Sequence, residues 1–179
     1  MTTISDTSPC FSCDGFCCRH NVVPLTDADV RRLIDESGNT IDQVIDFVSV
    51  EDLESTHHDI SFGNGYQYMV LKRRDGCCVF FDGEKRGGFC SIHSSKPMLC
   101  RIYPFFLAPF GEVILRYRNM CKTDWKMTKE AEEELKKMWG AYQEELENFN
   151  RFVSEWNSEK GENRAKDKKT FLAQISTKE

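Results

Sequence analysis

Long apolar runs and long basic runs are both missing from this sequence. No window approaches the roughly 20 apolar residues of a membrane-spanning helix, and residues 1–9 lack the basic flank and apolar stretch of a signal peptide. The formal net charge is −5, and the only lysine-rich stretch is the short segment 166–169. We therefore expect no membrane role, no nucleic-acid partner and a cytoplasmic location.

Several enzyme signatures are missing as well. The chain has no glycine-rich nucleotide loop of the Rossmann kind, and no Ser/His/Asp order or carboxylate pair stands out. These absences leave hydrolytic mechanisms without support. Whether the protein is an enzyme stays open at the level of the sequence.

Large apolar side chains, by contrast, are plentiful. The 179 residues include 13 phenylalanines, three tryptophans and five tyrosines, too many for an intrinsically disordered protein. A chain of this length buries roughly 70% of its unfolded surface when it folds, so it does not need disulfide bonds for stability. We expect one domain, or one domain with an appendage.

Cysteine is the most informative residue type here. Nine cysteines are present, and residues 122–179 contain none. Disulfides rarely persist in a reducing compartment and an odd number cannot pair completely, so metal or redox chemistry explains them better. The first four follow the pattern C-x2-C-x3-C-C: Cys10, Cys13, Cys17 and Cys18. This spacing lets one loop point several sulfurs at one centre. Four later cysteines can join them only through the fold: Cys78, Cys90, Cys100 and Cys121.

The type of donor points to particular metals. Soft thiolates in a tetrahedral sulfur environment favour zinc or an iron–sulfur cluster over harder ions. The alternative is that a cysteine serves as a small buried apolar side chain. That explanation is poor for the first four together, but it stays open for Cys77 and, taken one at a time, for Cys78, Cys90, Cys100 and Cys121. His20 and His93 could supply nitrogen ligands, but with so many thiols present we expect them in an outer or surface position.

Helix signals dominate the first third of the chain. Residues 10–20 are expected to form a loop. Thr26 and Asp29 have the spacing of a capping box, which predicts a helix that ends at Gly38. Apolar residues at helical spacing predict a second helix over residues 41–50.

The middle of the chain is expected to be β-rich and wrapped around cysteines. Short strands are predicted at residues 66–72, 79–81, 89–92, 105–108 and 112–118. The last two should form a hairpin, and the first should follow a turn at Gly63-Asn64-Gly65. In the weakly patterned stretch before that turn, His57 and His58 are expected to be an exposed pair.

A long amphipathic helix is predicted from Thr128 to about Gly161. Large apolar side chains recur there every three or four residues among Glu and Lys, and the first turn is acidic, as suits a helix N-terminus. Such a stripe is packing surface, against the core or against an unknown protein partner. A short second helix is expected at about 165–175.

Together these elements predict an α+β fold. Residues 1–125 should form a small cysteine-rich, metal-centred domain with short strands, hairpins and N-terminal helices. Residues 126–179 should form a helical extension that packs on it.

Four motifs occur in order between residues 10 and 121. They are Cys10-x2-Cys13-x3-Cys17-Cys18, Cys78-Val-Phe-Phe-Asp82, Phe89-Cys90-Ser-Ile-His93, and Lys96-Pro97-Met-Leu-Cys100-Arg101-Ile-Tyr103-Pro104-Phe105. This set resembles the cysteine-cluster (CxxCxxxCC) family of zinc- or iron-chelating domains. The chain departs from the family pattern in having histidine at position 93, where tyrosine is usual, and lysine at position 96, where arginine is usual.

The resemblance implies metal binding through eight cysteines: Cys10, Cys13, Cys17, Cys18, Cys78, Cys90, Cys100 and Cys121. It extends distantly to flagellin lysine methylases, larger proteins whose related cysteine region goes with an iron–sulfur cluster and methyl transfer from S-adenosylmethionine. We do not carry that activity over to this chain.

The last motif can also be interpreted from its residues alone. Pro97 restricts the backbone and Pro104 stops any helix that includes Cys100, so a stiff turn is expected over residues 97–104. This turn should present the Arg101 guanidinium beside the thiolates, where it would offset their charge or bind an anionic ligand. A salt bridge to one of the many acids is the alternative.

Two functions fit these observations, and we prefer the first. The protein holds an iron–sulfur cluster, of the 4Fe–4S type, with a redox or cluster-assisted transfer role. Alternatively, structural zinc stabilises an interaction module. Thiol–disulfide exchange at Cys10-x-x-Cys13 has less support, because the βαβ context of such redox motifs is missing.

Overall fold

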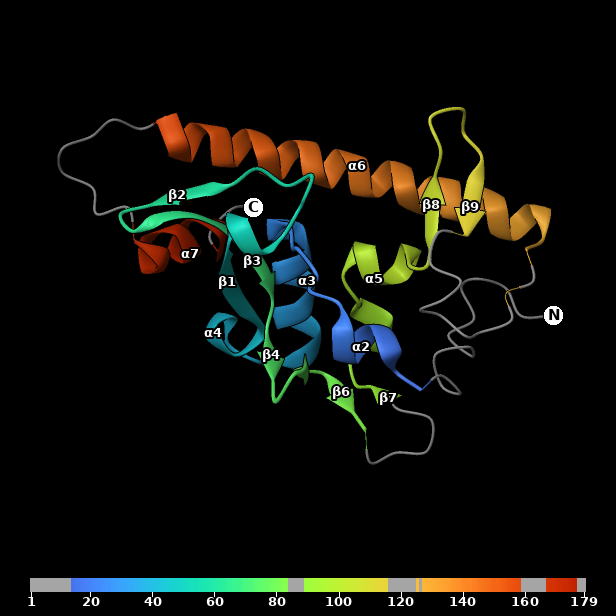
Figure 1. The fold of residues 1–179 in the computed structure, drawn as a ribbon, viewed down its shortest axis with the longest axis horizontal. Helices are drawn as coiled ribbons and strands as arrows, with labels where there is room; N and C mark the ends of the chain where they lie inside the picture. Colours follow the sequence, from blue (N-terminus) through green and yellow to red (C-terminus); the bar gives the residue numbers. More distant parts are fainter. Residues whose placement is uncertain (1–13, 84–88, 116–124, 126, 159–166, 177–179) are drawn as a thin grey trace. The chain divides into compact units, whose positions relative to one another are not determined.

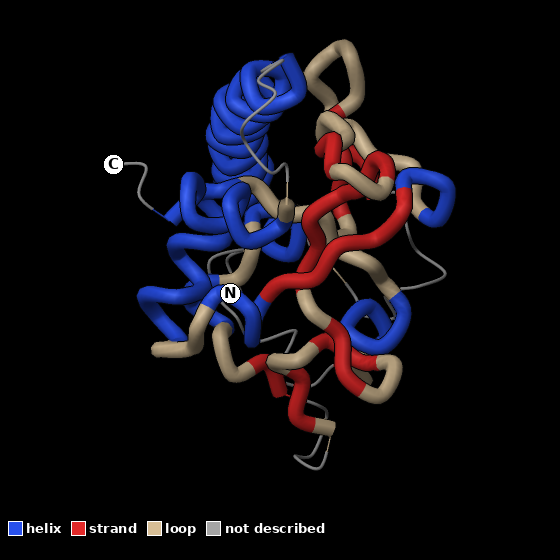
Figure 2. The backbone as a smooth tube through the Cα atoms, turned by 90° about the vertical axis from the view of Figure 1, so that its left-hand side faces the viewer, coloured by secondary structure: helices blue, strands red, loops and turns tan. Residues whose placement is uncertain are grey.

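The computed structural model of the chain describes residues 14–83, 89–115, 125, 127–158 and 167–176. The described part combines helices with small antiparallel sheets, which confirms the predicted α+β class (Figure 1; Figure 2 shows helices in blue and strands in red). Residue contacts divide the chain into two units. Unit 1 comprises Met1–Asn21 and Arg73–Gln143, and unit 2 comprises Val22–Lys72 and Glu144–Glu179. The domain division at residues 125/126 stays a prediction.

Unit 2 contains the largest sheet, with strand order β1-β3-β2 (Figure 1). β1 is Ile45–Ser49, β2 is Ile60–Phe62 and β3 is Gly65–Leu71, and both neighbouring pairs are antiparallel. The predicted strand at 66–72 is thereby confirmed. The predicted turn is also present, because Gly63 and Asn64 connect Phe62 to its cross-strand partner Gly65. β2 itself was not predicted.

The structure confirms the capping signals that the sequence shows for the first long helix. α3 spans Asp27–Ser37. The Thr26 hydroxyl accepts a hydrogen bond from the Asp29 N–H at 3.1 Å, and an Asp29 carboxylate oxygen accepts one from the Thr26 N–H at 3.3 Å. Gly38 ends the helix in the left-handed conformation, with φ of 65°, which glycine adopts without a steric cost.

The prediction of a helix over residues 41–50 is wrong beyond its first turn. α4 spans only Ile41–Val44, and the chain continues directly as β1. Ile45 pairs with Leu71 and Val48 with Tyr68 across the sheet. β-branched and aromatic side chains fit a pleated sheet surface better than a helix, so cross-strand pairing prevails over the apolar spacing.

The long helix α6 spans Lys129–Ser158, and unit 2 includes its residues from Glu144 onward. The aromatic stripe predicted as packing surface is buried there, with Phe149 at 1% and Trp156 at 3% exposure. α7, Lys168–Ser176, adds Phe171, whose ring lies 5.2 Å from that of Trp156 and 5.8 Å from that of Phe62. The predicted helix end at Gly161 lies outside the described residues. Within the described residues, no helix combines the length and the apolar character that crossing a membrane requires.

Side chains of α6 also bind the backbone that leads into β2. The Asn157 amide donates to the Asp59 carbonyl and accepts from the Ser61 N–H, both at 2.8 Å. Asn150 does the same for the Thr56 carbonyl and the His58 N–H, at 3.2 and 2.7 Å. These amides supply hydrogen bonds that an edge segment would otherwise take from water or from another strand.

The expectation of an exposed His57–His58 pair is half wrong. His58 is exposed, but His57 is buried, with 5% exposure. Its ring lies 6.0 Å from that of Phe149, and its Nδ1 lies 3.1 Å from the Ser55 hydroxyl. Burial lowers the pKa of His57 to about 4, so the ring is neutral at pH 7 and packs as an aromatic side chain.

The described residues of unit 1 form three two-stranded hairpins. β4 (Arg73–Arg74) pairs with β5 (Cys77–Cys78), β6 (Phe81–Asp82) with β7 (Phe89–Cys90), and β8 (Phe105–Leu107) with β9 (Val113–Leu115). The β8–β9 hairpin was predicted. The strand predicted at 79–81 is displaced, because Val79 and Phe80 form a turn and β6 begins at Phe81.

Two further sequence expectations in unit 1 need correction. Within the segment 10–20, residues Phe16–His20 form a short helix, α2, instead of a loop. The predicted stiff turn over 97–104 contains the short helix α5, Met98–Ile102. Pro97 is the N-cap and Pro104 follows the C-cap Tyr103, so neither proline interrupts the helix. Met98 and Ile102 lie one helical turn apart and are both buried, which favours a helix between them. α5 does end before Pro104, as expected.

Candidate metal centre

The described cysteines lie on four elements of unit 1; all are partly buried, and none of these six forms a disulfide. They are Cys17 and Cys18 on α2, Cys77 and Cys78 on β5, Cys90 on β7 and Cys100 on α5. Cys10, Cys13 and Cys121 lie outside the described residues. The cysteines named in the sequence as ligands therefore come from separate elements, and only the fold can bring them together.

Four of these thiols are close enough to affect one another's ionisation. Burial raises the pKa of Cys78 to about 11, and the nearby Cys90 and Cys17 thiols add to the shift. Burial also raises the pKa of Cys100 well above its usual value, with Cys78, Cys17 and Cys90 acting in the same direction.

The α2 thiols are coupled within the helix. A hydrogen bond with Cys18 is the largest cause of the raised pKa of Cys17, followed by burial and by the charge of Cys18. Cys18 is therefore a fifth thiol next to the four just described, Cys17, Cys78, Cys90 and Cys100.

This donor set fits a soft cation chemically. Thiolates that are buried and repel one another are costly to ionise, and a bound cation removes that cost by neutralising their charge. Among the residues that the structure describes, no three His, Cys, Asp or Glu side chains already form a group that could hold a metal ion. The assignment of individual cysteines as ligands therefore stays a prediction.

Cys77 and Cys78 have different surroundings although they are adjacent. Neighbouring residues of a strand point to opposite faces. Because Cys78 interacts with Cys90 and Cys17, Cys77 lies on the other face of β5. This geometry favours the explanation of Cys77 as a half-buried apolar side chain rather than as a ligand.

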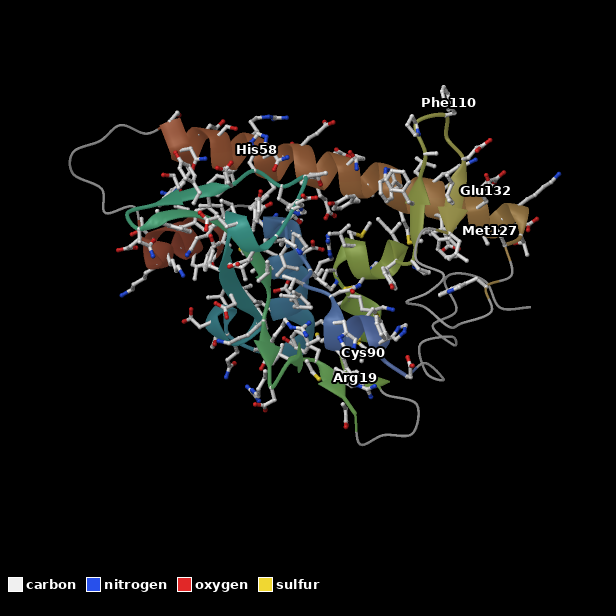
Figure 3. All side chains as sticks on the ribbon, viewed as in Figure 1. Arg19, His58, Cys90, Phe110, Met127 and Glu132 are labelled. Carbon is white, nitrogen blue, oxygen red and sulfur yellow. The ribbon has the colours of Figure 1, made fainter. Side chains whose placement is uncertain are left out.

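Phe81 joins α2 to the β6–β7 hairpin. The Arg19 guanidinium lies over the Phe81 ring at 5.1 Å, and a Cβ on Gly15 would lie 2.2 Å from the same ring. Phe81 pairs with Cys90 across the hairpin. Arg19 and Cys90 are labelled in Figure 3. Helix α2, which carries Cys17, therefore packs against β6, and β6 pairs with the strand that carries Cys90.

Arg73 makes a comparable connection between α2 and the β4–β5 hairpin. Its guanidinium donates to the carbonyls of Arg19 and Asn21 at the end of α2, and to the carbonyl of Gly76 in the hairpin turn. The charge of Arg73 lowers the pKa of the opposite Cys78, against the stronger effect of burial.

Two cations of the last motif lie near the sulfurs or shape the loop before α5. The charge of Lys96 lowers the pKa values of Cys17 and Cys100, although burial and the other thiols outweigh it. The Arg101 guanidinium donates to the Lys96 carbonyl at 2.8 Å and to the Ser94 carbonyl at 2.6 Å. These bonds stabilise the loop, a role of Arg101 that was not predicted from the sequence. Binding of Arg101 to a cofactor stays a prediction.

The two candidate histidine ligands lie in different settings. His20 is exposed, and its ring lies 4.3 Å from that of Phe16. His93 is half-buried, with its Nε2 3.2 Å from the Lys96 ammonium. Burial and the charge of Lys96 lower the pKa of His93 to about 4, so the ring is neutral at pH 7.

Arg73, Gly15 and Phe81 organise the site but were not predicted from the sequence. One signal was available for the first of them. Asp75-Gly76 is a strong two-residue hairpin signal, and both residues do have positive φ, 52° and 78°. The hairpin places Arg73 opposite Cys78, but which carbonyls its side chain reaches depends on the tertiary structure.

Comparison with known proteins agrees with the thiol-rich site. The model of the CxxCxxCC family, described as a putative zinc- or iron-chelating domain, matches residues 9–138. Searches of curated proteins and of solved structures found no match, and the distant similarity to flagellin lysine methylases stays a prediction. Because the match spans well over half of the chain and includes all nine cysteines, the chain belongs to the CxxCxxCC family of zinc- or iron-chelating domains, whose class of function is metal binding.

Proposed function

We propose that this protein holds an iron–sulfur cluster through thiolates drawn from α2, β5, β7 and α5. The observation that carries the proposal is that four partly buried thiols on separate elements of unit 1, Cys17, Cys78, Cys90 and Cys100, lie near enough for the charge of one to shift the pKa of another. Four thiolates are the usual ligand set of a cubane cluster. Cys10, Cys13, Cys18 and Cys121 are the further ligands that the family resemblance implies.

The chain's own residues would bind the cluster and offset its charge. When bound, the cluster supplies one-electron redox chemistry or assists a group transfer. Lys96 and Arg73 place positive charge near the thiolates, which stabilises the anionic ligand set. Partial burial of Cys78 and Cys100 limits the contact of that set with bulk water, and burial is one of the properties that set a cluster's reduction potential.

The decisive experiment is anaerobic purification of the full chain. We expect a brown protein with broad visible absorption near ~400 nm, and iron and acid-labile sulfide in equal amounts. A quadruple variant in which serine replaces Cys17, Cys78, Cys90 and Cys100 should be colourless. A colourless wild-type protein that contains zinc alone would contradict the cluster.

Structural zinc is the second candidate, because four thiolates can also supply all the ligands of one tetrahedral zinc ion. In that case the metal stabilises the fold of unit 1, and the protein acts as an interaction module. Elemental analysis separates the two candidates. One or two zinc ions per chain without sulfide would support zinc, and iron with sulfide would exclude it.

A further inference from the structure

Arg73 connects two thiol-bearing segments that are far apart in the sequence. Its Nη1 donates to the Asn21 carbonyl at 2.6 Å, and its Nη2 donates to the carbonyls of Arg19 and Gly76. Two of these acceptors close α2, and the third lies in the turn of the β4–β5 hairpin; α2 and β4 are labelled in Figure 1.

The acceptors suit a guanidinium in particular. The last carbonyls of a helix have no partner within the helix and carry partial negative charge. A guanidinium offers five N–H donors in a rigid planar arrangement, so one side chain can bind several carbonyls at once. A lysine has the same charge but offers its donors from a single flexible point.

The bonds of Arg73 matter for the metal site because cysteines lie close to both of the segments that it connects. Cys17 and Cys18 lie one to two residues before Arg19, and Cys78 lies directly opposite Arg73 across the hairpin. The bonds therefore set the distance between the α2 thiols and the β5 thiol. They involve only protein atoms, so a metal is not a partner in any of them.

We propose that Arg73 is a positioning residue that brings together two of the four thiol-bearing elements of the metal centre, α2 and β5, before the metal binds. This inference rests on the metal-binding function proposed above, and it adds a residue outside the cysteine motifs. Preassembly removes the cost of ordering two segments from the binding step, which raises metal affinity.

Arg74 provides the matched control. It is the next residue in β4, it is exposed, and it lies opposite Cys77 instead of Cys78. Because adjacent strand residues point to opposite faces, Arg74→Gln removes the same charge from the same strand on the other face.

The test compares three variants of the full chain: Arg73→Gln, Arg73→Lys and Arg74→Gln. Zinc affinity is measured by competition with a chromogenic chelator. Amide hydrogen exchange of the metal-free proteins is followed by mass spectrometry. We expect both Arg73 variants to bind zinc at least ~10-fold more weakly than wild type. In their metal-free forms, residues 15–21 and 73–78 should exchange at least ~10-fold faster, while the strands of unit 2 stay protected.

Arg74→Gln should remain within about twofold of wild type in both measurements. Wild-type zinc affinity in Arg73→Lys would overturn the proposal, because charge alone would then be sufficient. Unchanged exchange in metal-free Arg73→Gln, or complete loss of protection in these segments of the metal-free wild type, would also overturn it. If wild type itself binds neither zinc nor iron, the proposed function fails, and hydrogen exchange still decides whether Arg73 connects the two segments.

Discussion

At the scale of single residues, the adjacent Cys77 and Cys78 allow a direct test of the proposed site. Cys78 interacts with other thiols and Cys77 lies on the opposite face of β5. We predict that Cys78→Ser lowers metal affinity by more than ~100-fold, beyond the 10–100-fold typical of losing an outer partner of a ligand. Elemental analysis and chelator competition measure the effect.

Cys77→Ser is the matched control for that variant. Both side chains are partly buried thiols of one strand, so serine has a similar packing cost at either position. Metal content should stay at the wild-type level in Cys77→Ser. Equal losses in the two variants would show that Cys78 acts through folding and not as a ligand.

His57 makes a separate prediction about pH. Burial lowers its pKa to about 4 in the folded protein, against 6.5 for the unperturbed side chain. Protonation of His57 therefore favours the unfolded state. This contribution to stability is complete above pH 6.5 and is lost as the pH falls toward 4. The loss amounts to about 3 kcal/mol. Urea unfolding of the full chain at several pH values between 8 and 4 measures this decrease in the free energy of unfolding.

The variant His57→Leu should remove that component of the pH dependence. The exposed neighbour His58 supplies the control, because His58→Gln should leave the wild-type pH dependence in place. A His57→Leu protein that loses stability on acidification as steeply as wild type would refute the assignment to His57.

At the scale of elements, α6 binds the segment before β2 through side-chain amides. Asn157→Ala would leave the Asp59 carbonyl and the Ser61 N–H without their α6 partner. We predict a decrease of about 1–3 kcal/mol in the free energy of unfolding, measured by urea denaturation. Asn148→Ala, an exposed asparagine of the same helix, should change it by less than about 0.5 kcal/mol; an equal effect would show that helix propensity and not these bonds is responsible.

The packing of α2 against the β6–β7 hairpin requires glycine at position 15, because a larger residue there would clash with Phe81. Gly15 has φ of 72°, and a Cβ there would lie 2.2 Å from the Phe81 ring. We predict that Gly15→Ala destabilises unit 1 by more than the ~1 kcal/mol cost of a left-handed alanine and lowers metal affinity at least ~10-fold. Thermal unfolding and chelator competition test this.

The variant Gly111→Ala is the control that separates the cost of backbone strain from the cost of the clash with Phe81. Gly111 has φ of 82°, but a Cβ at this position would have no described atom within 4 Å, so Gly111→Ala carries the backbone cost alone. Its metal affinity should equal that of wild type. A Gly15→Ala protein that behaves like Gly111→Ala would mean that Phe81 moves aside and does not position α2.

At the scale of the whole molecule, the cysteines and the largest sheet belong to different units. All nine cysteines fall within the residues of unit 1, and unit 2 has none. Removal of the metal by a chelator should therefore raise amide exchange in unit 1, most of all around Cys90 and Cys100, which Arg73 does not bind. The β1-β3-β2 sheet should stay protected, because its core is apolar. Loss of protection throughout the chain would contradict this separation.

Several whole-molecule expectations remain predictions. They are the protein partner of the C-terminal helix, the absence of a nucleic-acid partner and the cytoplasmic location. In unit 2 the apolar residues of α6 pack against other parts of the chain, as Phe149 and Trp156 do. That packing accounts for the aromatic stripe without requiring a partner.

The sequence by itself determined what depends on neighbouring residues. The Thr26–Asp29 capping box and the Gly38 stop of α3 involve groups at most a few residues apart, so their pattern predicts their structure. The clustering of soft thiols identified the type of metal chemistry, and the family match agrees with it. The β8–β9 hairpin was predictable for the same local reason.

Only the tertiary structure decided what depends on residues distant in the sequence. Ile45 to Ser49 became a strand because β3 supplied its hydrogen bonds, and His57 became buried because α6 brought Phe149 to it. The interaction of thiols from four elements and the contact of Arg73 with α2 arise in the same way. Free energies of pairing, burial and charge interaction depend on separation in space, which local sequence patterns do not encode.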